Sequence, residues 1–271
     1  MCNKRQIYSH HSGGDRRAAS YLCTHLASHG YVVAALDHSE VVAAELALPA
    51  DGTPHQRVEW ARRTWAPARV RDVRFLIDLM LERTTVDAGR IGIVGHSFGG
   101  WTALATPEQD SRVGAVVALA PAGSEPPPPG IIPVSLGFQW GRDVATMYLV
   151  AEDDASLPLD GMHQLYERTP APKRMLILRR ADHLHFIDDV EHVHEAFRTT
   201  PLSGPVAQIQ RRMRPISELC SGEESHLMVR GLTVAHFDAT LRGSLRAQRF
   251  LNDDLAAELA DRGIAATIIG P

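Results

Sequence analysis

The chain has 271 residues and a formal net charge of -4, with 28 Lys and Arg against 32 Asp and Glu. This charge balance excludes a basic nucleic-acid binder. A hydrophobic fraction of 44% with 22% charged residues excludes a disordered or fibrous chain. No apolar run is long enough to span a membrane, and the opening residues lack the apolar core of a signal peptide. We therefore expect a globular cytoplasmic protein.

Apolar runs alternate with helical patterns along most of the chain. The expected strands cover residues 5–9, 31–37, 91–94, 113–119, 145–150 and 174–178. The expected helices cover residues 16–28, 58–83, 100–106, 160–169 and most of 227–260, and the second of these is interrupted near Pro67. Continuous apolar runs between helices are typical of buried parallel strands. The alternation predicts one α/β domain, 1–271, with a doubly wound, mostly parallel sheet and helices on both faces.

Three segments break the alternation, and the tail is ambiguous. Residues 38–56 are expected to form a surface excursion. Residues 123–143 contain four consecutive prolines followed by apolar residues, which favours a stiff loop that covers the sheet or forms a wall of a substrate pocket. Residues 199–225 are rich in Pro, Gly and Arg and could serve as a lid, a dimer arm or a plain insertion, with a solvated basic run at 211–214. The tail 264–269 is either a last strand or a loose end.

The cysteines argue against zinc and disulfide chemistry. Cys2, Cys23 and Cys220 are odd in number, far apart, and form no Cys-x-x-Cys pair. We expect them to be reduced and structural.

The strongest chemical motif lies where the strand at 91–94 meets the following helix. Residues 95–99 read Gly-His-Ser-Phe-Gly and fit the pattern Gly-x-Ser-x-Gly. Such a turn is sharp and strained, and its glycines avoid collisions with neighbouring backbone while the serine is lifted above the sheet edge. The pattern predicts Ser97 as a nucleophile and the backbone N–H of Phe98 as a donor to an oxyanion.

At this point the chain resembles the α/β-hydrolases, in particular the serine esterases similar to dienelactone hydrolase and platelet-activating-factor acetylhydrolase. The resemblance covers roughly residues 5–187, and it is clearest at 8–14, 95–100, 151–154 and 181–183. It implies the α/β-hydrolase fold, here reduced at the N-terminal edge of the sheet. Either the sheet itself is smaller than usual, or the sequence is shorter than a fuller gene product that could carry further residues or a signal peptide.

The resemblance also implies a triad in the order serine, acid, histidine. Asp154 falls on the acid position of the loop after strand 145–150, with Asp153 as the alternative. His183 falls on the base position after strand 174–178, with His185 as the alternative.

The remaining site residues are implied by the same resemblance or by their place in the chain. The turn at 10–14 is similar to the family's His-Gly-x-Gly-Gly segment, with His11 in place of a glycine, so that Ser12 would supply the second oxyanion N–H. His11, Trp101 and Trp140 are expected to contact substrate, although both tryptophans could also be core residues.

A metal site is the weaker interpretation of the histidine-rich stretch 183–194. His192 and His194 point to different sides of a helix, and no His-Glu-x-x-His pattern occurs, so we expect solvated histidines and neither metal nor cofactor.

The expected function is a carboxylesterase that acts on a small ester through an acyl-enzyme. The same triad could instead cleave a polyester, a lactone, an amide or a phospholipid acetyl group. A non-catalytic binding protein with this fold is the alternative from another class. The sequence leaves a homodimer open.

Overall fold

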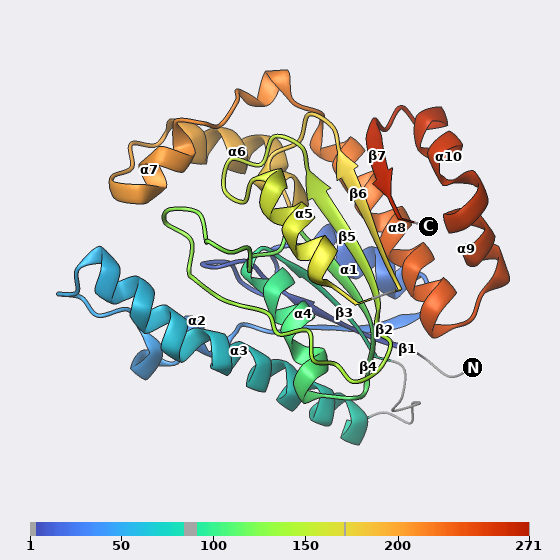
Figure 1. The fold of residues 1–271 in the computed structure, drawn as a ribbon, viewed down its shortest axis with the longest axis horizontal. Coiled ribbons are helices and arrows are strands. Elements are labelled where there is room, and N and C mark those ends of the chain that lie inside the picture. The colour runs from blue at the N-terminus through green and yellow to red at the C-terminus, as the bar shows by residue number, and fades with distance from the viewer. Residues whose placement is uncertain (1–3, 84–90, 171, 271) are drawn as a thin grey trace.

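The computed structural model describes residues 4–83, 91–170 and 172–270 (Figure 1). Cys2 therefore lies outside the described residues. None of the helices in these ranges is long and apolar enough to cross a membrane.

A seven-stranded sheet forms the centre of the molecule, with the strand order β2-β1-β3-β4-β5-β6-β7 (Figure 1). The strands are β1 (Lys4–Ser9), β2 (Tyr31–Ala35), β3 (Ile91–His96), β4 (Val113–Leu119), β5 (Ala145–Ala151), β6 (Lys173–Leu178) and β7 (Ala266–Ile269). Neighbours from β2 through to β6 pair in parallel, and β7 pairs antiparallel with β6. The predicted doubly wound, mostly parallel sheet is confirmed, and the tail of the chain is a strand.

The helices follow the predicted pattern, with one correction. The α-helices are α1 (Ser20–Ser28), α2 (Ser39–Val42), α3 (Pro54–Arg83), α4 (Phe98–Gln109), α5 (Leu159–Arg168), α6 (Val190–Thr199), α7 (Gly204–Gln210), α8 (Gly222–Leu241), α9 (Leu245–Arg249) and α10 (Leu255–Asp261). Short 3-10 turns lie at Ala44–Leu46, His183–Phe186 and Ile216–Glu218, and a π-helical turn covers Phe250–Asp254. Pro67 does not interrupt α3. Ala66 and Val70, before and after Pro67 in the sequence, are buried in the hydrophobic core, and this burial offsets the hydrogen bond that proline removes.

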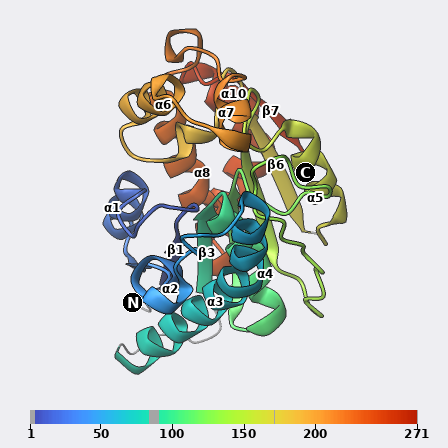
Figure 2. The ribbon, with the colours of Figure 1, turned by 90° about the vertical axis from the view of Figure 1, so that its left-hand side faces the viewer.

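Two hydrophobic layers cover the sheet. Helices α3, α4 and α5 pack on one face, and α1, α8, α9 and α10 pack on the other (Figures 1 and 2). Along β4, Val116 and Ala118 belong to the first layer, whereas Ala115, Val117 and Leu119 belong to the second. This period of two is the alternation of a strand buried on both faces.

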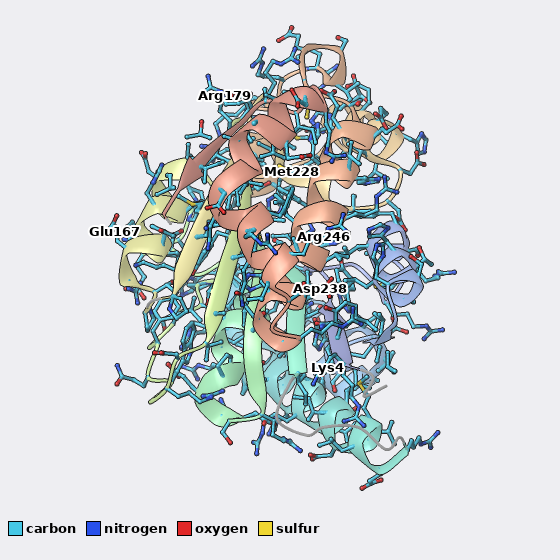
Figure 3. The ribbon with its side chains drawn as sticks, turned by 90° about the vertical axis from the view of Figure 1, so that its right-hand side faces the viewer. Lys4, Glu167, Arg179, Met228, Asp238 and Arg246 are labelled. Carbon is cyan, nitrogen blue, oxygen red and sulfur yellow. The ribbon has the colours of Figure 1, made fainter. Side chains whose placement is uncertain are left out.

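A groove of about 860 Å³ lies on the second face, between α8 and the C-terminal helices. Met228 and Asp238 of α8 and Arg246 of α9 line it (Figure 3). Its lining comes from α1, α8 and the segment 244–264, so this groove is separate from the motif around Ser97.

Candidate active site

The side chains predicted to carry chemistry follow three strands of the parallel part of the sheet. Ser97 comes directly after β3, Asp154 follows β5, and His183 follows β6. The carboxyl ends of parallel strands meet at one edge of the sheet, which is where ligands bind in open α/β folds. The strand order therefore carries all three to the same edge.

Ser97 sits on a strained turn between β3 and α4. Its φ is 59° and its ψ is -115°, a backbone conformation that side chains other than glycine rarely adopt. Two backbone hydrogen bonds stabilise this strained conformation. The Ser97 N–H donates to Leu119 O at 2.9 Å, and Ser97 O accepts from Ala122 N at 2.9 Å. The turn therefore fixes the serine at the N-terminus of α4.

The two glycines of the motif are required by close backbone contacts. A Cβ on Gly95 would lie 2.1 Å from Gly99 O, and a Cβ on Gly99 would lie 1.9 Å from Ser9 O. Both distances are far below van der Waals contact with backbone that cannot move aside. Helix α4 can therefore start directly against the ends of β1 and β3.

Asp154 and His183 form a buried hydrogen-bonded pair. His183 Nδ1 lies 2.7 Å from Asp154 Oδ2, and the side chains are 10% and 1% exposed. The other oxygen, Asp154 Oδ1, accepts from the backbone N–H groups of Ser156 and Leu157. An ionised carboxylate only accepts, so Nδ1 of the imidazole carries the proton and Nε2 is left as an acceptor.

The structure also places the two alternatives of the sequence analysis. Asp153 is paired with Arg214 at 3.2 Å. His185 is fully buried and lies 3.0 Å from Cys220 O through Nε2, while its Nδ1 accepts from the Asp182 N–H. The ion pair engages Asp153 and the backbone contacts engage His185, outside the Asp154–His183 pair.

The pKa of His183 is raised above that of a free imidazole. Burial disfavours the imidazolium, but the charge of Asp154 and its hydrogen bond together outweigh burial and favour the protonated form. A base with a raised pKa accepts a proton more readily at neutral pH.

The rings of His96 and His11 form a row with the ring of His183, with His96 in the middle. The His96 ring lies 4.7 Å from the His183 ring and 5.4 Å from the His11 ring, measured between centroids. Burial, followed by the neighbouring His183 and His11, lowers the pKa of His96 well below its ordinary value. His96 is thus a neutral aromatic spacer next to Ser97, and the sequence motif gave no sign of this role.

The turn predicted to hold the second oxyanion donor is tight and partly exposed. Gly14 N donates to His11 O at 3.1 Å, and Ser12 lies at the exposed tip. The His11 ring packs on Gly14, where a Cβ would come within 2.7 Å of the ring. Phe98 is the first residue of α4, so its N–H has no acceptor within the helix.

Trp101 and Trp140 both lie in the hydrophobic layer between the sheet and α3. The Trp101 indole N–H donates to Ser135 O at 2.9 Å, and the Trp140 indole N–H donates to Leu104 O at 3.2 Å. Trp101 also lines a cavity of about 210 Å³, to which residues 135–137 of the Pro-rich segment contribute. In this structure the two tryptophans anchor residues 123–143 onto α4, which is the core position that the sequence left as an alternative.

The basic run at 211–214 is not a fully solvated face, which corrects the expectation. Arg212 donates to Ala155 O at 2.8 Å, Arg214 pairs with Asp153, and Met213 is buried. Ile209, Met213 and Ala155 form a small apolar cluster against which Leu184 packs. The segment 199–225 therefore packs beside the loops that carry Asp154 and His183.

The histidines and carboxylates of residues 183–194 do not converge on one site. His192 is exposed, as expected, but His194 is fully buried and its Nε2 lies 3.8 Å from Asp182 Oδ2. The expectation of a solvated His194 is wrong because that face of α6 packs against the His183–Phe186 turn and the His185 ring.

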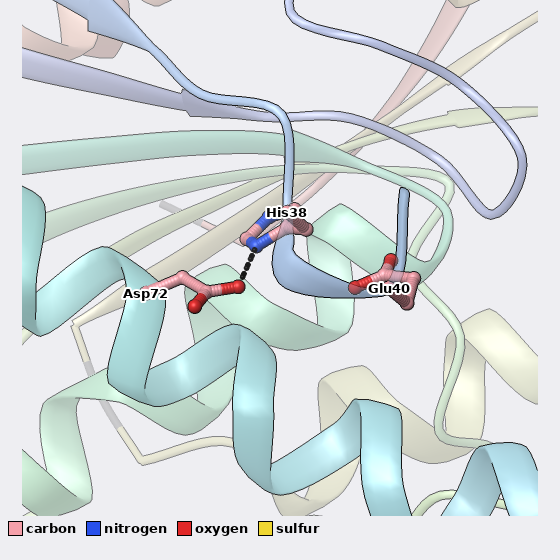
Figure 4. Close-up of side chains that lie close together, drawn as sticks. All are labelled: His38, Glu40 and Asp72. Carbon is pink, nitrogen blue, oxygen red and sulfur yellow. Dashed lines mark hydrogen bonds and ion pairs between the residues drawn. The ribbon is translucent and has the colours of Figure 1, made fainter. Parts of the chain in front are cut away.

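A different cluster has metal-ligand composition. Donor atoms of His38, Glu40 and Asp72 all lie within 4.8 Å of one another (Figure 4). However, Arg69 lies 2.5 Å from Glu40, and the His38 ring is engaged at both nitrogens, with Ser9 Oγ at 2.7 Å and Asp72 at 3.1 Å. The guanidinium opposes a cation here, and both His38 nitrogens and Glu40 Oε1 already have partners, so the residues do not fit a metal.

Ser9, His38 and Asp72 form a hydrogen-bonded Ser-His-Asp chain away from Ser97. Ser9 and His38 are 0% exposed. A substrate cannot reach a hydroxyl in that position, so this chain is structural and serves as an internal comparison for Ser97.

Besides His96, burial keeps other histidines neutral in the folded state, and four of them have a pKa of about 4. Burial lowers the pKa of His10, His11, His38 and His236 from 6.5 to about 4 in each case. The unfolded chain takes up these protons near its ordinary pKa, whereas the folded chain does not until about pH 4. The unfolded state thus binds more protons in this window, and stability falls as the pH drops from 6.5 towards 4.

We expect the free energy of unfolding in urea to decrease across this window by at most about 1.4 kcal/mol per proton per pH unit. His183, with its raised pKa, offsets part of this decrease. His236→Gln should reduce the slope by close to one proton. A free energy of unfolding that does not change between pH 6.5 and 4.5 would contradict the assignment.

Comparisons with known proteins agree with this fold. Residues 46–123 match the model of the prolyl oligopeptidase family, and residues 6–72 match that of platelet-activating factor acetylhydrolase, isoform II. A ferulic acid esterase structure from Streptomyces cinnamoneus superposes with a TM-score of 0.63 at 23% identity, covering 90% of this chain and 69% of that chain. The structural likeness shows the fold.

Two curated relatives are similar over part of their length. The platelet-activating factor acetylhydrolase of Bos taurus is 24% identical over 229 residues, which is 67% of this chain and 47% of the relative. The Cavia porcellus protein of the same name is 26% identical over 151 residues, 42% of this chain and 34% of the relative. The chain thus spans less than half the length of these relatives.

Proposed function

We propose that this chain, which has the α/β-hydrolase fold, is a serine esterase that hydrolyses carboxylic esters through an acyl-enzyme on Ser97. The observation that carries the proposal is the buried 2.7 Å contact between Asp154 and His183 at the sheet edge that also bears the strained Ser97. A nucleophile turn, a base and an orienting acid are the parts that acyl transfer needs.

Each residue has a defined role in the proposed reaction. Ser97 Oγ attacks the ester carbonyl carbon while His183 Nε2 takes the hydroxyl proton. Asp154 holds the tautomer that leaves Nε2 free and stabilises the imidazolium. The N–H groups of Phe98 and Ser12 stabilise the oxyanion of the tetrahedral intermediate. His183 then gives the proton to the leaving alkoxide, and water cleaves the acyl-enzyme by the same steps.

We propose a small acyl group as the substrate. The similarity to proteins named acetylhydrolases supports an acetyl or other short ester. Neither the 860 Å³ groove nor the 210 Å³ cavity is lined by Ser97 or His183, so neither serves as an acyl pocket. Polyester, lactone and phospholipid-acetyl substrates would be cleaved by the same chemistry and are the alternatives to this proposal.

The test is a series of p-nitrophenyl esters from acetyl to palmitoyl, together with labelling by a fluorophosphonate probe. We expect kcat/KM to be highest for the shortest acyl chains and the probe to label one serine. Rising activity with chain length would instead indicate an open, lipase-like groove. A folded protein that neither cleaves an ester nor takes the probe would contradict the proposal and favour a non-catalytic binding protein.

A further inference from the structure

The side chain of Arg69 contacts the turn at residues 10–14, which carries the proposed oxyanion donor Ser12. Arg69 comes from the middle of α3, its side chain is 0% exposed, and it pairs with Glu40, whose side chain is 4% exposed. A buried arginine is costly unless its donors are all used. Arg69 divides its donors between Glu40 and two backbone carbonyls of the turn at the candidate active site.

Arg69 contacts the two segments that carry the proposed oxyanion donors. Nη1 donates to His10 O at 2.5 Å, and Nη2 donates to His11 O at 3.3 Å. On the other side, the guanidinium carbon lies 4.2 Å from the centroid of the Phe98 ring. One side chain thus contacts the turn before Ser12 and the residue whose N–H is the other donor.

The carbonyl of His11 is the decisive contact because it shares a peptide group with the Ser12 N–H. This oxygen accepts from Arg69 Nη2, from Gly14 N at 3.1 Å, and from His10 Nδ1 at 2.7 Å. In a planar trans peptide, C=O and N–H point in opposite directions. Fixing His11 O on the buried side therefore fixes the Ser12 N–H on the side away from Arg69. Donors on the oxygen also polarise that N–H and strengthen it as a donor.

Neighbouring groups keep His10 in the tautomer that this arrangement needs. His10 Nε2 accepts from the His38 N–H at 3.2 Å, which leaves the proton on Nδ1 for His11 O. The facing charged groups are Arg69 and Glu40, and burial together with Arg69 holds the pKa of His10 near 4. His10 thus stays neutral at working pH.

We propose that Arg69, paired with Glu40, is a positioning residue. Its hydrogen bonds to the carbonyl oxygens of His10 and His11 orient the Ser12 N–H of the oxyanion hole. The inference rests on the proposed esterase function. It assigns Arg69 an effect on kcat and none on the binding of the ground-state ester.

The test compares Arg69→Lys with the matched control Arg63→Met, an arginine of the same helix whose side chain is 71% exposed and pairs with Glu59. Lysine keeps the charge opposite Glu40 but lacks the planar fork that serves several acceptors. We expect kcat to fall about 10- to 100-fold with KM within about twofold. Inhibition by a trifluoromethyl ketone, whose adduct with Ser97 is an oxyanion, should weaken by a similar factor.

A double variant, Arg69→Met with Glu40→Gln, removes both charges and avoids an unpaired buried carboxylate. It should show the same loss of kcat at a temperature where circular dichroism shows it folded. Unchanged kcat in a folded Arg69→Lys, or a loss confined to KM, would overturn the inference while esterase activity in the wild type and Arg63→Met upholds the proposed function. Absence of ester hydrolysis in all variants, the wild type included, would overturn both.

Discussion

Replacing Ser97 by alanine lowers kcat/KM for a short ester by roughly 10⁶-fold, because the acyl-enzyme cannot form. The same variant takes no fluorophosphonate label. Alanine accepts the positive φ of this turn about as badly as serine does, so the fold and its melting temperature should change little. Label incorporation followed by mass spectrometry of the modified peptide measures the effect directly.

The matched control is Ser9→Ala. This variant breaks the other Ser-His-Asp chain, and the probe should still modify Ser97. If the label remained in Ser97→Ala, or if it were found on Ser9, the assignment of the nucleophile would be wrong. The contrast is sharp because the two serines differ in exposure and in backbone conformation: Ser97 is partly exposed at φ 59°, while Ser9 is buried in a regular strand.

Asp154→Asn should lower kcat by about 10⁴-fold, because an amide that donates to Nδ1 stabilises the wrong tautomer of His183. The pH dependence should change as well. Activity needs neutral His183, so kcat/KM of the wild type rises with pH through the raised pKa of this histidine. Without the carboxylate, burial lowers the pKa of the imidazole and only the charge of Asp182 still raises it, so the acidic limb of the variant's profile moves to lower pH.

The neighbouring Asp153→Asn is the control for this prediction. Asp153 is partly exposed and paired with Arg214, so its neutralisation should leave kcat within about twofold and the acidic limb in place. A large loss in Asp153→Asn with little change in Asp154→Asn would reverse the roles of the two aspartates.

Local features of the fold were predictable from sequence, and long-range ones were not. The Gly-x-Ser-x-Gly turn and the strands around it depend on adjacent residues, so the positions of β3, β4, β5 and β6 were anticipated closely. The uninterrupted α3 was missed because packing on both sides of Pro67 outweighs a local helix-breaking preference. The burial of His194 was missed because it depends on how α6 docks.

The surroundings of the candidate site show the same limit. Arg69 and His10 are 59 positions apart, and His38 and Asp72 are 34 apart. No periodicity or motif links such residues, since their contacts exist only once α2 and α3 pack on the end of β1. No role for Arg69 or His38 followed from the sequence, whereas the structure buries both and uses Arg69 to hold backbone carbonyls.

The close packing of Gly95 and Gly99 bears on how sequences of this kind should be interpreted. Both glycines are dictated by the carbonyl groups that a Cβ would strike, at Gly99 and Ser9, and neither takes part in bond making. A descendant that lost its catalytic hydroxyl would still need both glycines to close the turn. In a survey of related genes, the glycines record inheritance of an architecture, and the proposed positions Ser97, Asp154 and His183 are the ones that would distinguish active enzymes from silent copies.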